Sequence, residues 1–177
     1  MDLPSLVALR HDLHAHPELA FEEHRSSDLV AEFLRSLGLE VHRGLAGTGV
    51  VGVLRNGDSE RCIGLRADLD ALPLHEQNLF PHRSRHAGRM HACGHDGHTA
   101  MLLGAARELA ANSDFDGSVV FIFQPAEETD GGARVMIAQG GVRIDGEALD
   151  PATLDLPVDE LDGRVLQVGK RDRKSVV

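Results

Sequence analysis

Hydrophobic residues recur at helical spacing in three parts of the chain. The apolar positions of residues 4–16 follow three- and four-residue steps, which predicts a helix that ends before Pro17. Residues 22–37 carry a second apolar stripe, and Gly38 behind it is a common helix terminator. Residues 99–111 are rich in Ala and Leu, the best helix formers, and predict a third helix.

Between these segments the pattern changes to short apolar or alternating runs. Residues 39–42, 50–54 and 62–67 predict strands because glycine- and aspartate-rich turns separate them. Residues 118–123 are apolar without alternation, as expected for a strand that is buried on both faces. A glycine-rich turn then leads into a short helix predicted over residues 133–139.

Composition fits a globular α/β domain with an aliphatic core. The 177 residues suffice for one domain, or for one domain with a piece of another. Apolar residues make up 42% of the chain, but there are only six Phe and no Trp or Tyr. The periodicity fades after Gly141, where Asp, Gly and Pro become frequent.

Charge and hydropathy exclude several kinds of partner. The net charge of −10 and a pI near 5.5 argue against nucleic-acid binding, which favours a basic patch. No apolar run approaches the roughly 20 residues needed to cross a membrane, and the first residues do not resemble a signal peptide. Two cysteines do not make a disulfide framework, so a reduced, cytoplasmic setting is expected.

The densest cluster of metal-binding side chains lies just before the third helix. Within eight residues it contains His91, Cys93, His95, Asp96 and His98. Imidazole, thiolate and carboxylate are ligands of zinc and similar metals. We expect Thr99 to cap the helix, which leaves these donors on a loop where the helix dipole lowers the pKa of the thiol. The alternative is a polar loop with ordinary histidines.

Two pairs of carboxylates follow predicted strands. Asp68 and Asp70 are two residues apart, so in an extended backbone they point the same way and require a shared cation or donor. Glu127 and Glu128 follow the buried strand, where ligands commonly bind in open α/β sheets. Adjacent side chains diverge on an extended backbone, so one could bind metal while the other transfers protons. An Asp-rich turn and a solvated Glu pair are the structural alternatives.

Four segments, in this order, resemble one enzyme family. Residues 10–19, 65–73, 90–98 and 123–128 are similar to motifs of the amidohydrolases in the aminoacylase and carboxypeptidase metallopeptidase family. The branch with the strongest resemblance contains hippurate hydrolases, N-acyl-amino-acid hydrolases and indole-acetyl-amino-acid hydrolases. The order of the motifs over residues 5–141 makes the resemblance specific.

The resemblance implies a truncated three-layer α/β metallopeptidase-like catalytic domain with a mixed central sheet. It implies a general base at Glu127 and an orienting role for Asp70. Asp68 falls where related peptidases place a metal-binding histidine, so its role stays open. The implied metal ligands are Cys93, His95 and Glu128.

The implied activity is metal-dependent hydrolysis of N-acyl amino acids, such as hippurate-like amides, to a carboxylate and an amino acid. A complete site of this family would hold two divalent ions, which the donor types allow to be Zn, Mn, Co or Ni. A bound metal lowers the pKa of water and polarises the carbonyl, and a carboxylate transfers the proton. A papain-like pairing of Cys93 with a histidine is a weaker alternative, because it leaves the Glu pair unexplained.

The chain also departs from the family pattern. Family members are longer, carry an inserted domain through which they form homo-oligomers, and supply two later metal-binding histidines, whereas this chain has no histidine after His98. Residues 172–177 resemble a translated sequencing adapter. We therefore predict a partial catalytic domain over residues 1–141 and a divergent or artefactual tail over residues 142–177. A truncated, inactive metal-binding module and a structural zinc loop are the alternative functions.

Overall fold

A mixed sheet of four strands forms the centre of the molecule. The computed structural model describes residues 3–129, 131–139, 142–144, 147–148 and 166–168. The strands are β1 (Glu40–Leu45), β2 (Gly49–Asn56), β3 (Cys62–Asp68) and β4 (Gly117–Gln124). Their order in the sheet is β1-β2-β4-β3, with β3 and β4 parallel and the other neighbours antiparallel. All four strands predicted from the sequence are confirmed.

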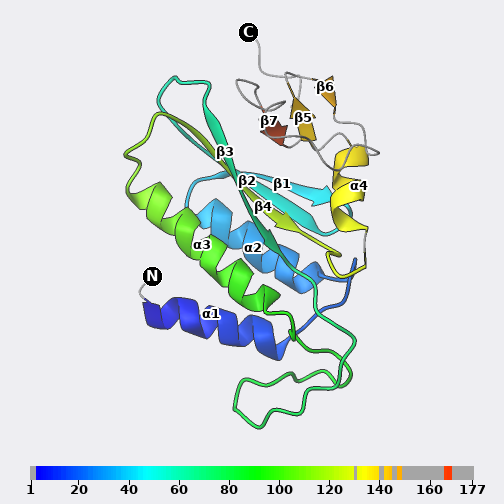
Figure 1. Cartoon of the computed structure of the whole chain (residues 1–177). Helices are drawn as coiled ribbons and strands as arrows, with labels where there is room; N and C mark the ends of the chain where they lie inside the picture. Colours follow the sequence, from blue (N-terminus) through cyan, green and yellow to red (C-terminus); the bar gives the residue numbers. More distant parts are fainter. Residues whose placement is uncertain (1–2, 130, 140–141, 145–146, 149–165, 169–177) are drawn as a thin grey trace.

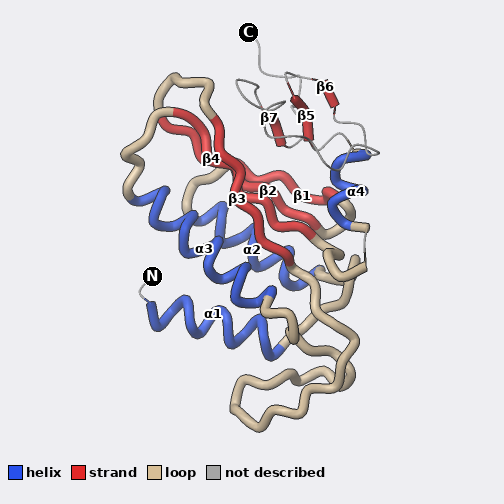
Figure 2. The backbone as a smooth tube through the Cα atoms, viewed as in Figure 1, coloured by secondary structure: helices blue, strands red, loops and turns tan. Residues whose placement is uncertain are grey.

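The helices cover both faces of this sheet. They are α1 (Leu3–Ala15), α2 (His24–Ser36), α3 (His95–Ala111) and α4 (Gly132–Ala138). Helices α2 and α3 lie on one face with α1 beside α3, and α4 lies near one end of the sheet (Figures 1 and 2). Each of these helices was predicted within a few residues of its observed bounds.

Alternate residues of β4 enter two separate apolar clusters. Phe121 and Phe123 pack in the larger cluster, which contains the buried apolar residues of α2 and α3. Val120, the residue before Phe121, packs instead with Val51 and with Met136 of α4, and Ile122, which lies between the two Phe, packs against the same smaller cluster. Successive side chains of a strand point to opposite faces, so β4 contributes to both clusters. This explains its unbroken apolar sequence and confirms the three-layer arrangement.

Helix α2 approaches the sheet closely where β2 has a glycine. A Cβ atom at Gly52 would lie 2.9 Å from Cδ1 of Leu34, which is 0% exposed. A side chain at this position would require the end of the Leu34 side chain to shift. Gly52 therefore lets Leu34 pack directly against the backbone of β2.

The carboxyl ends of β3 and β4 and the start of α3 lie at the same edge of the sheet. Asp68 at the end of β3 is opposite Gln124 at the end of β4. Helix α3 begins at His95, four residues before the predicted cap at Thr99, and Gly94 precedes it with a left-handed φ of 91°. The prediction of a Thr99 cap is therefore wrong. The Thr99 hydroxyl instead donates a hydrogen bond to the backbone oxygen of Asp68 at 2.9 Å, which ties α3 to β3.

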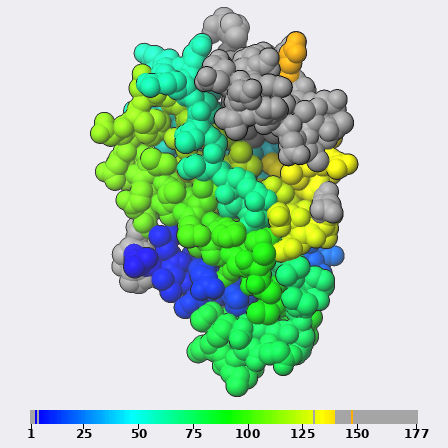
Figure 3. Space-filling view, viewed as in Figure 1, coloured from blue at the N-terminus to red at the C-terminus, as the bar shows by residue number. Residues whose placement is uncertain are grey.

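A long polar loop over residues 74–89 lies beyond this edge, as predicted, and forms one end of the molecule beside α1 (Figure 3). The backbones of Leu72 and Met90 pair through two hydrogen bonds of 3.0 Å and close the base of the loop. Among the described residues, every helix is too short or too polar to cross a membrane.

The predicted tail over residues 142–177 lies mostly outside the described residues. Three short strands are described there: β5 (Val142–Ile144), β6 (Glu147–Ala148) and β7 (Leu166–Val168). They form a second sheet in the order β6-β5-β7. The domain boundary after residue 141 stays a prediction.

The contact between α2 and β2 predicts a large effect of shortening Leu34. Leu34→Ala should lower the free energy of unfolding by about 2–5 kcal/mol, because it leaves a cavity in a closed core. Urea denaturation followed by circular dichroism measures this change. The matched control is Leu79→Ala, since Leu79 is 87% exposed and should change the value by less than about 0.5 kcal/mol. Equal effects of the two substitutions would contradict this account of the core.

Candidate metal centre

The side chain of His95 is the centre of the candidate site. It is buried at the first residue of α3, and its Nδ1 lies 2.8 Å from the backbone oxygen of Asp70. A carbonyl oxygen only accepts hydrogen bonds, so Nδ1 carries the proton and donates it. In the neutral ring Nε2 is then a free acceptor. A backbone partner on one ring nitrogen is the arrangement usual for metal-binding histidines.

Three carboxylate oxygens surround Nε2 of His95 at nearly equal distances. Oδ1 of Asp68 and Oε1 of Glu128 each lie 3.7 Å away, and Oε2 of Glu127 lies 3.8 Å away. These separations exceed hydrogen-bond length and suit ligand atoms that share an ion with Nε2, and Asp68 and Glu128 belong to two different groups of donors around His95.

Glu128 carries a further sign of a cation site. Its Oε1 is buried, and among the described residues it has no hydrogen-bond partner. A buried carboxylate oxygen without a partner is costly unless a cation or water meets it. The donor set and this oxygen together fit a divalent metal ion.

Two overlapping groups of side chains could hold a metal ion within the described residues. Cys93, His95 and Glu128, the three predicted ligands, place their ligand atoms within 4.8 Å of one another. Asp68, His95 and His98 form the second group by the same measure. His95 belongs to both groups, which places the two sets of donors side by side.

Asp70 contacts two of the predicted ligands. Its Oδ2 accepts a hydrogen bond of 2.9 Å from the backbone N–H of Glu128, and its Oδ1 lies 3.2 Å from Nδ1 of His95. The backbone oxygen of Asp70 therefore holds the His95 ring, and its carboxylate holds the Glu128 backbone, so that one residue orients both. This geometry suits the orienting role that the resemblance implies.

Asp68 already has two close partners. Its Oδ1 lies 2.7 Å from Nδ1 of His98, and its Oδ2 lies 3.0 Å from Nη1 of Arg66. The sequence grouped His98 with the metal-type donors but did not name it among the implied ligands. The pattern that could have found it is the three-residue spacing of His95 and His98, which puts them on one face of a helix that starts at His95.

Glu127 and Glu128 lie on a turn and not on extended backbone. The expectation that extended backbone would make them diverge is therefore wrong, and both carboxylates reach towards His95. They differ in access to solvent, because the Glu127 side chain is 40% exposed and that of Glu128 only 21%.

The acidic surroundings shift the pKa values of the site. Burial acts to raise the pKa of Asp70, but hydrogen bonds from His95 and from the backbone of Glu128 and Glu127 outweigh it and lower the pKa. Burial acts to lower the pKa of His95, but its interactions with Asp70 and Asp68 outweigh this and raise it. In the metal-free chain the site therefore favours a protonated His95 imidazole beside an ionised Asp70 carboxylate.

The pKa of the Cys93 thiol shifts in the opposite direction to the one predicted from the sequence. Hydrogen bonding to Glu128, together with desolvation and the neighbouring negative charges, raises the pKa of the thiol above its ordinary value. The predicted lowering by the helix dipole is wrong, because full carboxylate charges lie closer than the partial charge of the helix end. A bound cation would reverse this balance.

A second buried network lies behind the site and holds α1. Oδ2 of Asp96 lies 2.9 Å from Nδ1 of His14 and 3.0 Å from Nε of Arg10. Nε2 of His14 in turn lies 3.2 Å from Oε1 of Glu76 on the long loop. Asp96, which the sequence grouped with the metal-type donors, thus joins α1, α3 and the loop.

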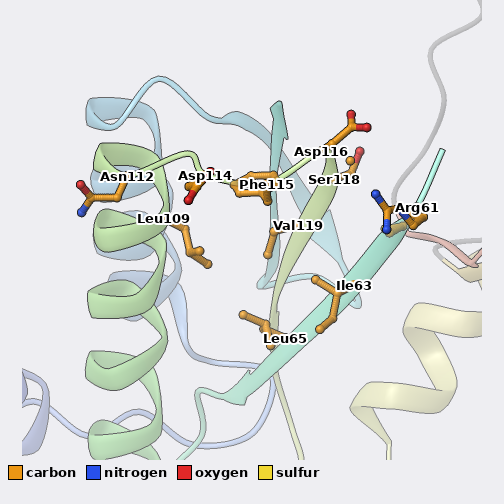
Figure 4. A pocket seen from close by; sticks show the side chains of 12 residues that line it. Arg61, Ile63, Leu65, Leu109, Asn112, Asp114, Phe115, Asp116, Ser118 and Val119 are labelled. Atoms are coloured by element: carbon orange, nitrogen blue, oxygen red, sulfur yellow. The ribbon is translucent and has the colours of Figure 1, made fainter. Parts of the chain in front are cut away.

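A cavity of about 570 Å³ lies at the other end of the sheet (Figure 4). Residues that line it include Ile63, Leu65, Leu109, Phe115 and Val119. These come from the first half of β3 and β4, from the end of α3 and from the turn that joins α3 to β4, so the cavity is separate from the carboxylate cluster.

Comparison with known proteins gives the family. Residues 64–167 match the profile of peptidase family M20/M25/M40, and the chain therefore belongs to this family. It is 52% identical over 132 residues to a hippurate hydrolase of Campylobacter jejuni, a match that covers 75% of this chain and 34% of the relative. It is 46% identical over 138 residues to an N-acyl-L-amino acid amidohydrolase of Geobacillus stearothermophilus, covering 76% and 37%.

A solved structure supports the same fold. The Bacillus subtilis YXEP protein, described as a dinuclear metal binding peptidase of the M20 family, superposes with a TM-score of 0.74 at 41% identity. The match covers 77% of this chain and 39% of that chain. The chain spans about a third of the length of the curated relatives it matches.

The burial of His91 beside the site leads us to predict that the stability of the fold depends on pH. Burial lowers its pKa to about 4, and neither ring nitrogen has a hydrogen-bond partner among the described residues. The unfolded chain has a histidine pKa near 6.5, so between about pH 6.5 and 4 it binds more protons than the folded chain. Stability should fall as the pH drops through this window, by at most about 1.4 kcal/mol per pH unit from this residue.

Urea denaturation of the chelator-treated chain at pH 7 and pH 5 measures the effect. His91→Leu should reduce the loss of stability at pH 5. The matched control His75→Leu, at an exposed histidine of the same loop region, should leave it unchanged. A pH dependence that is identical in all three proteins would contradict the assignment.

Proposed function

We propose that the chain carries the metal-binding part of an amidohydrolase that cleaves N-acyl amino acids to a carboxylate and an amino acid. The observation that supports this best is the convergence of Cys93, His95, Glu127 and Glu128 at one edge of the sheet. Family membership and the names of the relatives point to the same chemistry.

The proposed ligands are Cys93, His95 and Glu128. A divalent ion bound there would supply a water of lowered pKa and a polarised amide carbonyl. Zn, Mn, Co and Ni all suit a donor set of thiolate, imidazole and carboxylate. We propose two ions in a complete site, since the matched Bacillus subtilis protein is described as dinuclear.

Glu127 is the proposed general base. Its side chain is the more exposed of the pair, and it is 3.8 Å from Nε2 of His95, so its carboxylate faces the space where the ligands converge. There it can take a proton from water and pass it to the leaving amine. Asp70 orients His95 and Glu128 through the contacts described above.

A second candidate is a metal-binding module without activity. Such a module would hold its metal through Cys93, His95 and Glu128 and turn over no substrate. A structural zinc loop is a third reading, which would require the chain to unfold when metal is removed. The cytoplasmic setting and a homo-oligomer through a further domain stay predictions.

Removal of the thiol ligand should abolish metal binding. We expect Cys93→Ala to lose bound metal, because only two of the three proposed ligands remain. Co²⁺ titration and elemental analysis of the chain measure affinity and stoichiometry. The matched control is Cys62→Ala, since Cys62 is the other free cysteine and lies at the opposite end of β3. Cys93→Ala that retains metal like the unaltered chain would refute the ligand assignment.

The role of Glu127 can be tested in a chimera. The 132-residue segment of the Campylobacter jejuni hippurate hydrolase that matches this chain is replaced by the segment from this chain. Release of glycine from hippurate is then measured. We expect Glu127→Gln to keep its metal and to lose about 100- to 10,000-fold in kcat, the usual contribution of a general base.

Glu108→Gln on α3 is the matched control, because the Glu108 side chain is 62% exposed and, among the described residues, is paired only with the adjacent Arg107. Undiminished turnover by Glu127→Gln would rule out Glu127 as the base. A chimera that binds metal but never turns over hippurate would favour the inactive module.

A further inference from the structure

The turn that carries Glu127 and Glu128 begins with a strained residue. Ala126 has a φ of 51°, in the left-handed region, and it is completely buried. For a residue with a side chain this conformation is strained, because Cβ lies too close to the following carbonyl oxygen. Such a conformation persists only where the surrounding structure holds it, and it occurs often at functional sites.

A buried carboxylate from another part of the chain holds Ala126. Oε1 of Glu23 accepts a hydrogen bond of 2.8 Å from the backbone N–H of Ala126. Oε2 of Glu23 accepts a second hydrogen bond of 2.6 Å from the hydroxyl of Thr48. Glu23 precedes α2 and is 0% exposed. It connects the start of this helix, the β1–β2 turn and the end of β4.

Pairing with a positive charge does not explain why the Glu23 carboxylate is buried. Among the described ion pairs, none involves Glu23, so two neutral donors are its partners. Burying a carboxylate without a cation is costly. An apolar side chain would fill the same space without this cost, which points to a specific use of the two oxygens.

The turn is also fixed from its other side. Asp70 accepts the backbone N–H of Glu128, and Gly132 donates its backbone N–H to the oxygen of Ala126 at 3.1 Å. A Cβ atom at Gly132 would overlap the carbonyl oxygen of Pro125, so the chain passes too closely there for any side chain. Glu127 therefore lies between two residues whose N–H groups are each held by a buried carboxylate.

We propose that Glu23 is a positioning residue for the metal centre. Its hydrogen bond to Ala126 holds the left-handed turn that directs the carboxylates of Glu127 and Glu128 towards His95. This inference rests on the proposed function, because it assumes that Glu128 is a metal ligand. Rotation of the Ala126 backbone would displace both carboxylates together, so the effect on metal binding is larger than the loss of one hydrogen bond.

The test compares variants that remove one or both of the hydrogen bonds that the Glu23 side chain makes with Ala126 and Thr48. Glu23→Met removes both acceptors at similar size and should weaken Co²⁺ binding by about 10- to 100-fold, the usual effect of losing a partner that orients a ligand. Glu23→Gln should restore near-normal affinity, since its amide oxygen can accept the Ala126 N–H while its amide nitrogen donates to Thr48. The visible absorption of bound Co²⁺ should change in Glu23→Met and not in Glu23→Gln.

Thr48→Val is the matched control for a purely structural effect. It breaks the other hydrogen bond of the same carboxylate and should lower the stability of the chain, while Co²⁺ affinity stays near that of the unaltered protein. If Glu23→Met does not fold by circular dichroism, Glu23→Asp is used instead. Its carboxylate is one methylene shorter and should withdraw from the backbone N–H of Ala126, so this variant should also weaken Co²⁺ binding.

Glu128→Gln, measured in parallel, distinguishes failure of the positioning role of Glu23 from failure of the ligand assignment. If folded Glu23→Met, or Glu23→Asp in its place, binds Co²⁺ with unaltered affinity and spectrum while Glu128→Gln binds weakly, the positioning role is overturned and the ligand assignment stands. If Glu128→Gln binds Co²⁺ like the unaltered chain, the ligand assignment itself fails, and with it the inference.

Discussion

The parallel pairing of β3 with β4 is the constraint on which the rest of the structure depends. It brings the ends of two strands that are far apart in sequence to one edge, with Asp68 opposite Gln124. The hydroxyl of Thr99 on α3 bonds to the backbone of Asp68, so the helix that starts with His95 begins at the same edge. Without this register, the side chains of residues 68–70, 93–98 and 127–128 would not meet.

Negative charge is concentrated around a single imidazole at this edge. Carboxylates of Asp68, Glu127 and Glu128 lie within 3.8 Å of His95 Nε2, and the pKa of the nearby Cys93 thiol is raised. Carboxylates held this close together repel one another unless a cation lies among them. The same repulsion that destabilises the metal-free site therefore favours a divalent ion, which connects the fold of the chain to the hydrolytic chemistry of its family.

The site is held by groups that themselves do not face the ligand space. Asp70 fixes the His95 ring and the Glu128 backbone, while Glu23 fixes the strained residue before Glu127. Asp96 joins α1 and α3 behind them through His14 and Arg10. Buried carboxylates with specific hydrogen-bond partners thus fix the orientation of the site side chains, which apolar packing alone does not determine.

The sequence by itself determined the helices, the strands and the main candidate ligands, because periodicity and residue chemistry are local. Tertiary structure decided where α3 begins, since the Thr99 hydroxyl bonds to β3 and does not cap the helix. It also decided the direction of the Cys93 pKa shift, because carboxylates from distant strands outweigh the helix dipole. The contact of Glu23 with Ala126 joins residues 103 positions apart. Local patterns cannot indicate it, because packing of α2 on the sheet alone brings the two together.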